Sequence, residues 1–133
     1  MCIFCKIING EIPSYKVYED DNFLAFLDIS QTTIGHTLVV PKKHYENIFQ
    51  LPEDCDIFKV VIKIANALKK ALNISDINIQ NNNGIFAGQT VNHYHIHLIP
   101  RYENDNFKIN FSENKLSKEE FETLKSKIEN NIK

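Results

Sequence analysis

Apolar and polar positions alternate along the first part of the chain in a way that predicts short elements. Residues 3–8 fit a short helix that ends before Gly10. Residues 15–19 and 23–28 have the composition of strands, and the polar residues 20–22 between them indicate a tight connection. A hairpin is therefore expected to open a sheet.

The next part of the chain changes from a strand pattern to a helix pattern. Residues 36–41 add a third strand that is rich in β-branched side chains. From Asp54 the apolar positions recur every three or four residues over about 18 residues, which predicts an amphipathic helix. These positions are Ile57, Phe58, Val61, Ile64, Ala65, Leu68 and Leu72. The helix is expected to cover one face of the sheet.

Two more strands and a last helix complete the pattern. Strands are expected at residues 77–80 and 92–100, and Ser117 with Glu120 forms a capping box at the start of the closing helix. An antiparallel meander sheet, with one central amphipathic helix and a helix near each terminus, predicts an α+β fold. The length of 133 residues fits a single domain over residues 1–133.

Composition and charge narrow the class of protein. With 43% hydrophobic and 24% charged residues, the chain is in the ordinary globular range. No apolar run reaches the roughly 18 residues of a membrane-spanning helix, and the N-terminal apolar stretch is too short for a signal peptide. A cytoplasmic protein without a membrane partner is therefore expected. The net charge of −2 argues against a nucleic-acid polymer, although a single phosphate group needs no basic surface.

The three cysteines suggest a site near the N-terminus. An odd number of cysteines, without a secretion signal, argues against a disulfide framework. Cys2 and Cys5 form a Cys-x-x-Cys pair, which is typical of redox or metal sites, whereas Cys55 falls in the predicted long helix. The residues alone leave both interpretations of the pair open.

Three of the five histidines lie in one short segment. His93, His95 and His97 are separated by single aromatic or aliphatic residues. On a strand, this period of two presents all three imidazoles on one face and the intervening side chains on the other, against the central helix. Either the three imidazoles bind one metal ion, or one is a nucleophile and the others assist it.

The loop before the histidines favours a phosphate ligand. Residues 84–91 contain Gly88, whose missing side chain lets the backbone approach a ligand closely. Gln89 and Thr90 add neutral hydrogen-bond donors. Glycine next to neutral donors is typical of a phosphate-binding loop.

At this point the sequence resembles the histidine triad family of nucleotide hydrolases and transferases. The family signature, His-x-His-x-His followed by two apolar residues, is matched within residues 87–101. Further matching segments lie at residues 2–8, 11–13, 26–30, 35–44 and 82–84, so the resemblance covers residues 2–101. It implies the family fold, in the bacterial, zinc-bearing branch, and an enzyme that acts on small nucleotides.

The resemblance implies covalent catalysis at the α-phosphate of a purine nucleotide conjugate. His95 would attack the phosphorus and carry the nucleoside monophosphate until water releases it. An imidazole suits this role because it is largely neutral at pH 7, so one ring nitrogen is bare. The N–H of the other ring nitrogen is expected to donate to a backbone carbonyl. His97 would contact the phosphate with His36 behind it in a polar relay. Gln89 and Thr90 would bind phosphate oxygens or assist the leaving group.

The resemblance also implies a nucleotide pocket around Asp28, which would bind the ribose hydroxyls. Phe26 and Ile29 would form an apolar slot for the base, although packing in the core explains these two side chains equally well. Asn82 would reach the ribose or the phosphate, and Gly88 would belong to the phosphate loop.

Zinc-bearing members of the family pair a Cys-x-x-Cys with two histidines. Here the ligands would be Cys2, Cys5, His44 and His93, a closed tetrahedral set that is typical of structural zinc. A redox pair of the thioredoxin type needs a strand before the motif, and only one residue precedes Cys2. Cys55 is expected to bind no metal, and no organic cofactor is expected.

The resemblance implies a homodimer, with the central helix or an adjacent strand at the interface. Phosphoramidates, dinucleoside polyphosphates and nucleotidyl sugars share the same α-phosphate, so the leaving group stays open. A non-catalytic nucleotide sensor or adaptor is one competing function. A metal-dependent hydrolase with His93, His95 and His97 on one ion is another, although the first and last would lie roughly 13 Å apart on a strand.

Overall fold

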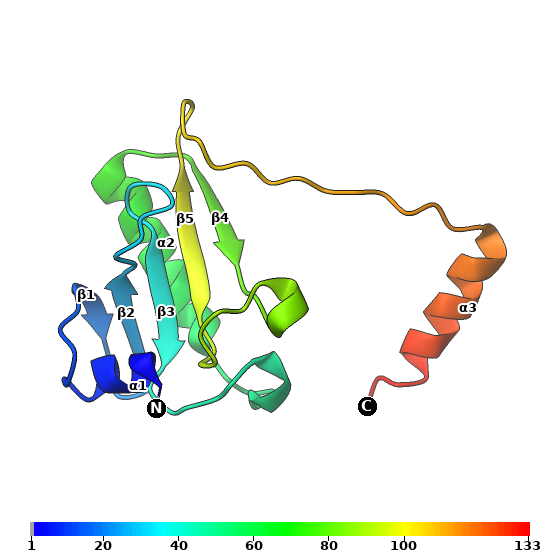
Figure 1. The fold of residues 1–133 in the computed structure, drawn as a ribbon, viewed down its shortest axis with the longest axis horizontal. Helices are drawn as coiled ribbons and strands as arrows, with labels where there is room; N and C mark the ends of the chain where they lie inside the picture. The colour runs from blue at the N-terminus through cyan, green and yellow to red at the C-terminus, as the bar shows by residue number, and fades with distance from the viewer. Residues whose placement is uncertain (1) are drawn as a thin grey trace.

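The computed structural model describes residues 2–133, which form one five-stranded sheet and three α-helices (Figure 1). The strands are β1 (Lys16–Glu19), β2 (Phe23–Leu27), β3 (Thr37–Pro41), β4 (Asp76–Gln80) and β5 (Ile96–Arg101). The helices are α1 (Ile3–Ile8), α2 (Ile57–Leu72) and α3 (Lys118–Glu129), with short 3-10 turns η1 (Ile48–Gln50) and η2 (Ile85–Ala87). The predicted α+β class is confirmed.

The sheet is antiparallel, with the strand order β1-β2-β3-β5-β4. The first three strands form a meander. The chain then crosses through α2 to β4 at the edge of the sheet, and β5 returns between β3 and β4. In this register His97 of β5 lies between Leu38 of β3 and Gln80 of β4. The backbone that carries the last triad histidine is therefore held on both sides.

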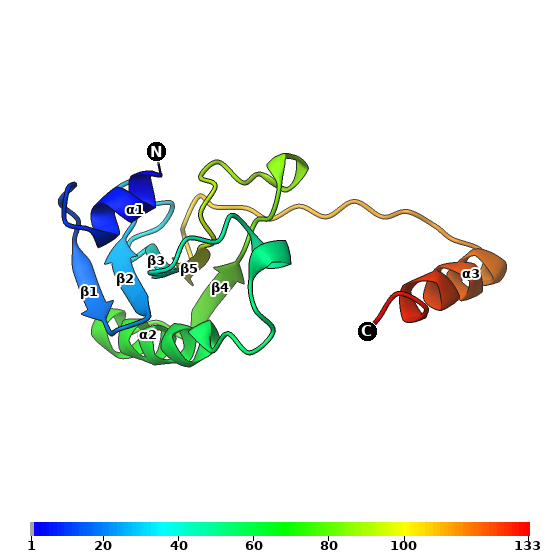
Figure 2. The ribbon, with the colours of Figure 1, turned by 90° about the horizontal axis from the view of Figure 1, so that it is seen from below.

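Two apolar layers pack against the sheet. Figure 2 shows α2 along one face and α1 on the opposite face. Val61 and Ile64 of α2 pack on Ile96 of β5, because every third or fourth residue of the helix faces the sheet. On the other face, Phe4 of α1 packs on Phe26 of β2. Because the sheet is packed on both faces, it forms a rigid surface on the side that carries α1.

The C-terminal part of the chain leaves this body. We call residues 2–107 the body and residues 108–133 the arm. An extended segment carries α3 away from the sheet (Figure 1), and every residue of the arm is exposed. The predicted capping box is present, with the Glu120 N–H 3.1 Å from Ser117 Oγ. Among the described residues, no helix is long and apolar enough to cross a bilayer.

Two predicted boundaries are wrong. β5 begins at Ile96 instead of residue 92, so His93 and His95 lie just before the strand. The reason is that the Tyr94 N–H donates at 2.7 Å to the Tyr45 carbonyl in the loop after β3 and not to a strand.

The second wrong boundary is the start of the long helix. α2 begins at Ile57, and Cys55 lies before it in a turn in which its N–H donates to the Pro52 carbonyl.

Candidate active site

A cleft of about 360 Å³ opens on the face of the sheet that carries α1. Its volume is in the range of sites that bind small molecules. Much of its wall is apolar and comes from Ile3, Phe4, Ile7, Ile12, Phe26, Leu27, Leu38 and Val91. Asp28, Thr90, His95 and His97 contribute polar groups to the same wall. Such a cleft can hold a ligand that is apolar in one part and strongly polar in another.

His95 is buried, and its ring orientation is fixed. Its Nδ1 lies 2.7 Å from the backbone carbonyl of His93, so this nitrogen carries the proton and donates, as expected from the sequence. The Nε2 lone pair is therefore free to react. Burial lowers the pKa of His95, which keeps the ring neutral at pH 7.

Two residues that sequence reasoning did not select hold His95 in place. Asn81 Nδ2 donates to the His95 backbone carbonyl at 2.8 Å. Phe4 packs edge-on against the imidazole, with ring centroids 5.1 Å apart and an interplanar angle of 84°. In the sequence, Asn81 is one of three consecutive asparagines and Phe4 is one of nine phenylalanines, so neither has a distinguishing signal.

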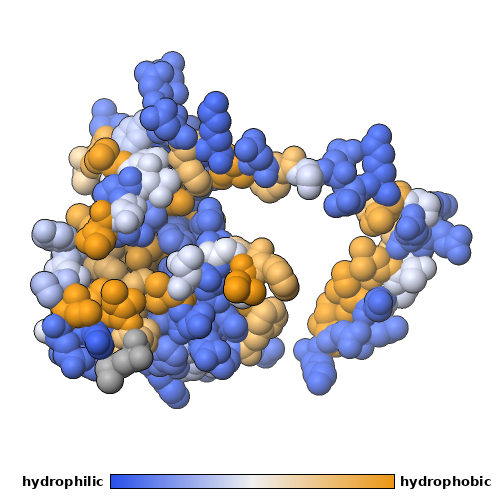
Figure 3. Space-filling model, viewed as in Figure 1, coloured by the Kyte–Doolittle hydropathy of each residue, from blue (hydrophilic) through white to orange (hydrophobic). Residues whose placement is uncertain are grey.

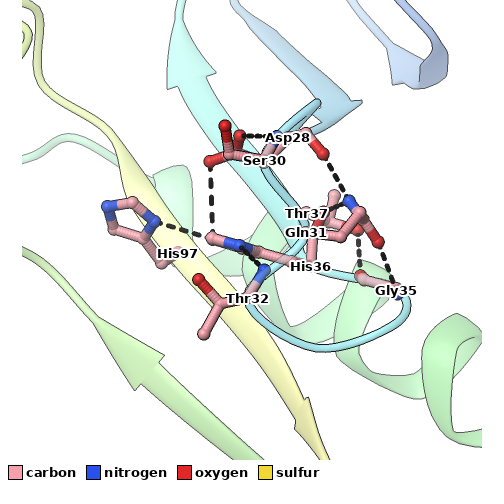
Figure 4. Close-up of polar contacts among 8 residues, drawn as sticks. All are labelled: Asp28, Ser30, Gln31, Thr32, Gly35, His36, Thr37 and His97. Carbon is pink, nitrogen blue, oxygen red and sulfur yellow. Dashed lines mark hydrogen bonds and ion pairs between the residues drawn. The ribbon is translucent and has the colours of Figure 1, made fainter. Parts of the chain in front are cut away.

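His97 and His36 form a hydrogen-bonded pair beside His95 (Figure 4). The Thr32 N–H donates to His36 Nδ1 at 3.3 Å, so the His36 proton is on Nε2. His36 Nε2 lies 2.9 Å from His97 Nδ1 and donates to it, which places the His97 proton on Nε2. The Asp28 carboxylate lies 3.7 Å from the same His36 nitrogen. The structure thus brings together His97 and His36, the two residues of the expected relay, and places Asp28 beside them.

The electrostatics of the cleft favour neutral imidazoles. The pKa of His97 is lowered to about 4, chiefly by burial and to a smaller extent by charge repulsion from the nearby His95 and His36. Burial also lowers the pKa of His36, while the Asp28 carboxylate partly opposes this effect. At pH 7 the cleft therefore offers a neutral nucleophile at His95 and an uncharged N–H donor at His97.

The loop between β2 and β3 holds Asp28 and His36 at a fixed separation (Figure 4). Gln31 Nε2 donates to the carbonyls of Asp28 and His36, the latter at 2.8 Å, and Gln31 Oε1 accepts from the Gly35 N–H at 2.7 Å. Gly35 has a φ of 99°, and a Cβ there would lie 2.5 Å from the Leu72 side chain. Only glycine fits this turn without rearrangement.

The loop before the histidines differs in part from the phosphate loop expected from the sequence. Thr90 lies in the cleft wall. Gln89 is engaged within the loop: its Oε1 accepts from the Gly84 N–H at 2.8 Å, and its Nε2 donates to the carbonyls of Glu46 at 2.7 Å and Val91 at 3.0 Å. In this arrangement Gln89 shapes the loop and has no free donor for a phosphate.

Of the other residues expected around a nucleotide, two line the cleft and two do not. Gly88 has a φ of 86° and ends η2, and Asn82 accepts from Gln80 Nε2 at 3.3 Å; neither lines the cleft. Phe26 lines the cleft and is also part of the core, with 3% of its side chain exposed. Ile29 lines the cleft and is 86% exposed, so packing in the core does not explain it.

A second cluster of ligating side chains lies at the N-terminus of α1. Cys2 Sγ is 3.4 Å from His93 Nδ1, and Cys5 Sγ is 3.4 Å from His44 Nδ1 and 3.6 Å from His93 Nδ1. His93 Nε2 donates to the Pro41 carbonyl at 2.8 Å, which leaves His93 Nδ1 bare. The four ligand atoms lie within 4.8 Å of one another, as in a tetrahedron with bonds of about 2.0 to 2.3 Å.

This donor set fits a zinc ion. The bare Nδ1 of His93 lies 3.1 Å from Nδ1 of His44 and faces two thiol sulfurs. Lone pairs crowded at this distance repel each other unless a proton or a cation lies between them. Burial and the Cys2 thiol raise the pKa of Cys5, so a pair of thiolates here needs a positive charge. Two thiolates and two neutral imidazoles are a set that Zn²⁺ prefers.

The comparison with known proteins identifies the family. The HIT domain profile matches residues 9–104, which is most of the chain. The chain belongs to the HIT family. An uncharacterized HIT-like protein of Methanocaldococcus jannaschii is 58% identical over 115 residues, covering 85% of this chain and 88% of the relative.

Two further HIT relatives match almost the whole chain. An adenosine 5'-monophosphoramidase of Schizosaccharomyces pombe is 38% identical over 135 residues, covering 99% of this chain and 98% of the relative. A crystal structure of a HIT family protein from Bacillus anthracis has 53% identity and a TM-score of 0.93, covering 99% of this chain and 97% of the other.

In this HIT protein the three triad histidines have different surroundings. His93 faces the Cys2 and Cys5 sulfurs, His95 faces the cleft, and His97 is bonded to His36. Their free nitrogens therefore do not converge on one point. The geometry does not support a metal ion bound by all three.

Proposed function

We propose that this HIT-family protein hydrolyses a small nucleotide conjugate at its α-phosphate, with His95 as the nucleophile. The observation that carries the proposal is the fixed tautomer of His95, whose proton on Nδ1 is held by a backbone carbonyl while the ring lies in the cleft wall. The Schizosaccharomyces pombe relative, an adenosine 5'-monophosphoramidase, supports an adenosine phosphoramidate as the first substrate to test.

The reaction proceeds in two displacements. The His95 Nε2 lone pair forms a bond to the α-phosphorus, the bond from phosphorus to the leaving nitrogen breaks, and the leaving group takes up a proton from solvent. The Nδ1–H of His95 stays hydrogen-bonded to the His93 carbonyl, and this bond stabilises the positive imidazole that results. Water then attacks the phosphorus and gives up a proton to solvent, the N–P bond breaks, and the nucleoside monophosphate leaves with neutral His95 restored.

His97, His36 and Thr90 support the developing charge. The Nε2–H of His97 is available to a phosphate oxygen because its Nδ1 accepts from His36. Thr90 is exposed at the cleft wall, where its hydroxyl can donate to the phosphate or to the leaving group. Gln89 assists only by shaping the loop. We assign Gly88 and Asn82 the same supporting role.

The purine nucleoside is placed by the remaining wall of the cleft. Asp28 presents a carboxylate there, and a carboxylate is a suitable acceptor for two ribose hydroxyls. Asp28 Oδ1 accepts from the Ser30 N–H at 2.8 Å, and this hydrogen bond fixes the orientation of the carboxylate. Phe26 and the exposed Ile29 flank this position and offer apolar surface to a purine.

We assign zinc a structural role at Cys2, Cys5, His44 and His93. A four-ligand set leaves no position for substrate, so the ion supplies no reaction step. Its effect is to hold α1, a helix of six residues that is too short to be stable alone. Because Phe4 of α1 packs on His95, the metal cluster supports the cleft wall.

We also propose a homodimer formed by β4 and α2. Within the described residues, β4 is an edge strand of the sheet. On α2, Phe58 and Ile62 are 52% and 59% exposed, although both are large and apolar. An open sheet edge and exposed large apolar side chains are each typical of an interface. A monomer in sedimentation at micromolar concentration contradicts the dimer and leaves the chemistry untouched.

The test is to trap the covalent intermediate. Protein is mixed with an adenosine phosphoramidate labelled at the α-phosphorus, quenched within milliseconds, and digested to locate the label. We expect an acid-labile, base-stable adduct on His95 and none in the His95→Asn variant. Bound AMP without an adduct or turnover identifies a nucleotide sensor. Turnover that stops on chelation, with the fold intact and no adduct, identifies a metal-dependent enzyme.

A further inference from the structure

The arm carries an apolar stripe that no other helix or strand of residues 2–133 covers (Figure 1). Phe121, Leu124 and Ile128 follow at intervals of three and four residues, so they lie on one face of α3, with exposed fractions of 57%, 45% and 55%. Phe111 in the extended segment before the helix is 92% exposed. Figure 3 shows apolar side chains gathered on the side of α3 that faces back toward the body.

The arm leaves the body from a fixed point. Arg101 Nε and one terminal nitrogen bind the two Asp105 carboxylate oxygens at 3.0 and 2.9 Å, and the other terminal nitrogen donates to Asn78 at 2.6 Å. The guanidinium also lies over the Phe107 ring, 4.9 Å from its centroid. The arm therefore begins at a fixed point, and from there it leads away from its own sheet (Figure 1).

A related crystal structure places the arm in the same way. The arm comprises 26 of the 133 residues, about a fifth of the chain. The Bacillus anthracis crystal structure superposes with a TM-score of 0.93 over 99% of this chain, which is incompatible with a different course for a fifth of the residues. A lone helix of 12 residues is marginal in water, so something holds it. In a crystal of one protein, the macromolecules beside the arm are other copies of the chain.

The body carries an apolar patch on the edge that faces the arm. We call Ile48 and Phe49 of η1, together with Ile85 and Phe86 of η2, the η patch. Their exposed fractions are 46%, 86%, 83% and 105%. The Ile48 N–H donates to Asn83 Oδ1 at 2.7 Å, which ties the two turns together. Apolar side chains are visible on this edge of the body in Figure 3.

The length of the arm and the apolar area of the arm and the η patch both fit docking on a second copy of the chain. Residues 108–117 are extended and span up to about 35 Å, roughly the width of a small domain, so α3 lies beyond its own body. A fully exposed aromatic side chain offers about 200 Å². The exposed apolar side chains of the arm and the η patch therefore present on the order of 1,000 Å² per chain, more than the roughly 800 Å² per partner of a standard interface.

We propose that the arm of each chain docks on the η patch of a second copy, with the stripe of α3 covering the partner's two turns. The exchange rests on the proposed homodimer and is independent of the proposed chemistry. In this arrangement the apolar face of α3 and the η patch of the partner bury each other. It also places two arms across one dimer, one from each chain.

The first test measures hydrogen exchange of the α3 amides in full-length protein, together with the dimer dissociation constant from sedimentation. The Phe49→Asp/Phe86→Asp variant changes only the body, and both side chains are exposed in their own chain. We expect it to remove the protection of α3 and to raise the dissociation constant about 30-fold or more. Protection of α3 that is unchanged in this variant overturns the proposal.

A matched pair of arm variants separates the stripe from the rest of α3. Phe121→Asp/Leu124→Asp places two charges on the stripe, and Thr123→Asp/Ser126→Asp places the same two charges on the opposite face of the helix. We expect the first variant to weaken the dimer as strongly as the η patch variant and the second to change the dissociation constant less than threefold. Equal effects of the two variants contradict docking through the stripe.

Mixing the two defective proteins decides whether the arm is exchanged. The η patch variant retains an intact arm, and the Phe121→Asp/Leu124→Asp variant retains an intact patch, so a mixed dimer has one complete arm–patch contact. We expect α3 of an isotope-labelled η patch variant to regain protection on mixing. No recovery means that the arm docks on its own body. A dimer with an unprotected wild-type α3 overturns the arm exchange alone, and a wild-type monomer overturns the proposed dimer as well.

Discussion

His93 and His95 are two residues apart, yet the fold assigns them opposite tautomers. His93 donates from Nε2 to the Pro41 carbonyl and leaves Nδ1 bare among the thiols. His95 donates from Nδ1 to the His93 carbonyl and leaves Nε2 bare. The partner of one ring nitrogen thus decides which nitrogen reacts and in what direction. Two backbone carbonyls thus prepare identical side chains for the two different roles that we propose, a metal ligand at His93 and a nucleophile at His95.

The largest expected effect is at the nucleophile. His95→Asn removes the attacking nitrogen, and we expect turnover of an adenosine phosphoramidate to fall by on the order of 10⁴- to 10⁶-fold. AMP should still bind within about threefold of the wild-type dissociation constant, because Asp28 and the apolar wall remain. Steady-state kinetics and calorimetric titration with AMP measure the two quantities. Residual turnover within tenfold of wild type refutes nucleophilic attack by His95.

For the proposed zinc site, which includes His93, the comparison predicts a change in stability instead of a change in turnover. Cys5→Ser removes one of four ligands, and we expect zinc to fall from about one equivalent per chain to near zero. If free zinc is at about 1,000 times its dissociation constant, the free energy of unfolding should fall by about 4 kcal/mol. Metal analysis and urea unfolding test this, with Cys55→Ser as the matched control. Equal stability of both variants contradicts a structural metal.

The relay to His36 predicts an intermediate loss of activity. His97→Asn removes the Nε2–H donor, and we expect kcat to fall about 10²- to 10³-fold with little change in zinc content. His36 and His97 are hydrogen-bonded, so the double variant with His36→Asn should be no more than about threefold worse than His97→Asn alone. Losses that multiply in the double variant show that the two residues act independently.

The lowered pKa of His97 predicts a dependence of stability on pH. Between pH 6.5 and about 4, the unfolded chain protonates His97 while the folded chain does not, so the unfolded state binds more protons and stability falls as pH falls. Each pKa unit corresponds to about 1.4 kcal/mol, and partial exposure of the ring reduces the total to roughly 1 to 3 kcal/mol. Urea unfolding of wild type and His97→Asn should therefore converge as pH is lowered. Parallel curves contradict this.

The smallest expected effect sharpens the role of the loop between Asp28 and His36. Gln31→Ala removes three hydrogen bonds that fix this loop, and we expect kcat to fall about tenfold with KM nearly unchanged. Gln50→Ala is the matched control, because Gln50 accepts from the Glu46 N–H in a loop that does not line the cleft. If both variants lower kcat alike, Gln31 has no specific positioning role.

The sequence by itself determined the local elements and the kinds of chemistry. The period of the apolar positions located α2, the capping box located the start of α3, and the spacing of His93, His95 and His97 indicated a site. These features are local, because a helix face or a cap depends on residues a few positions apart. Side-chain spacing therefore sufficed for them.

Only the tertiary structure decided how the chemistry is divided. Which nitrogen of His93 or His95 is bare depends on carbonyls supplied by the fold, and the supporting contacts of Phe4, Asn81 and Gln31 come from other elements. Gln89 looked like a phosphate donor in the sequence, yet its amide is engaged inside the loop. A hydrogen bond needs a partner at about 3 Å, and distances between remote residues are fixed by packing and not by their order in the chain.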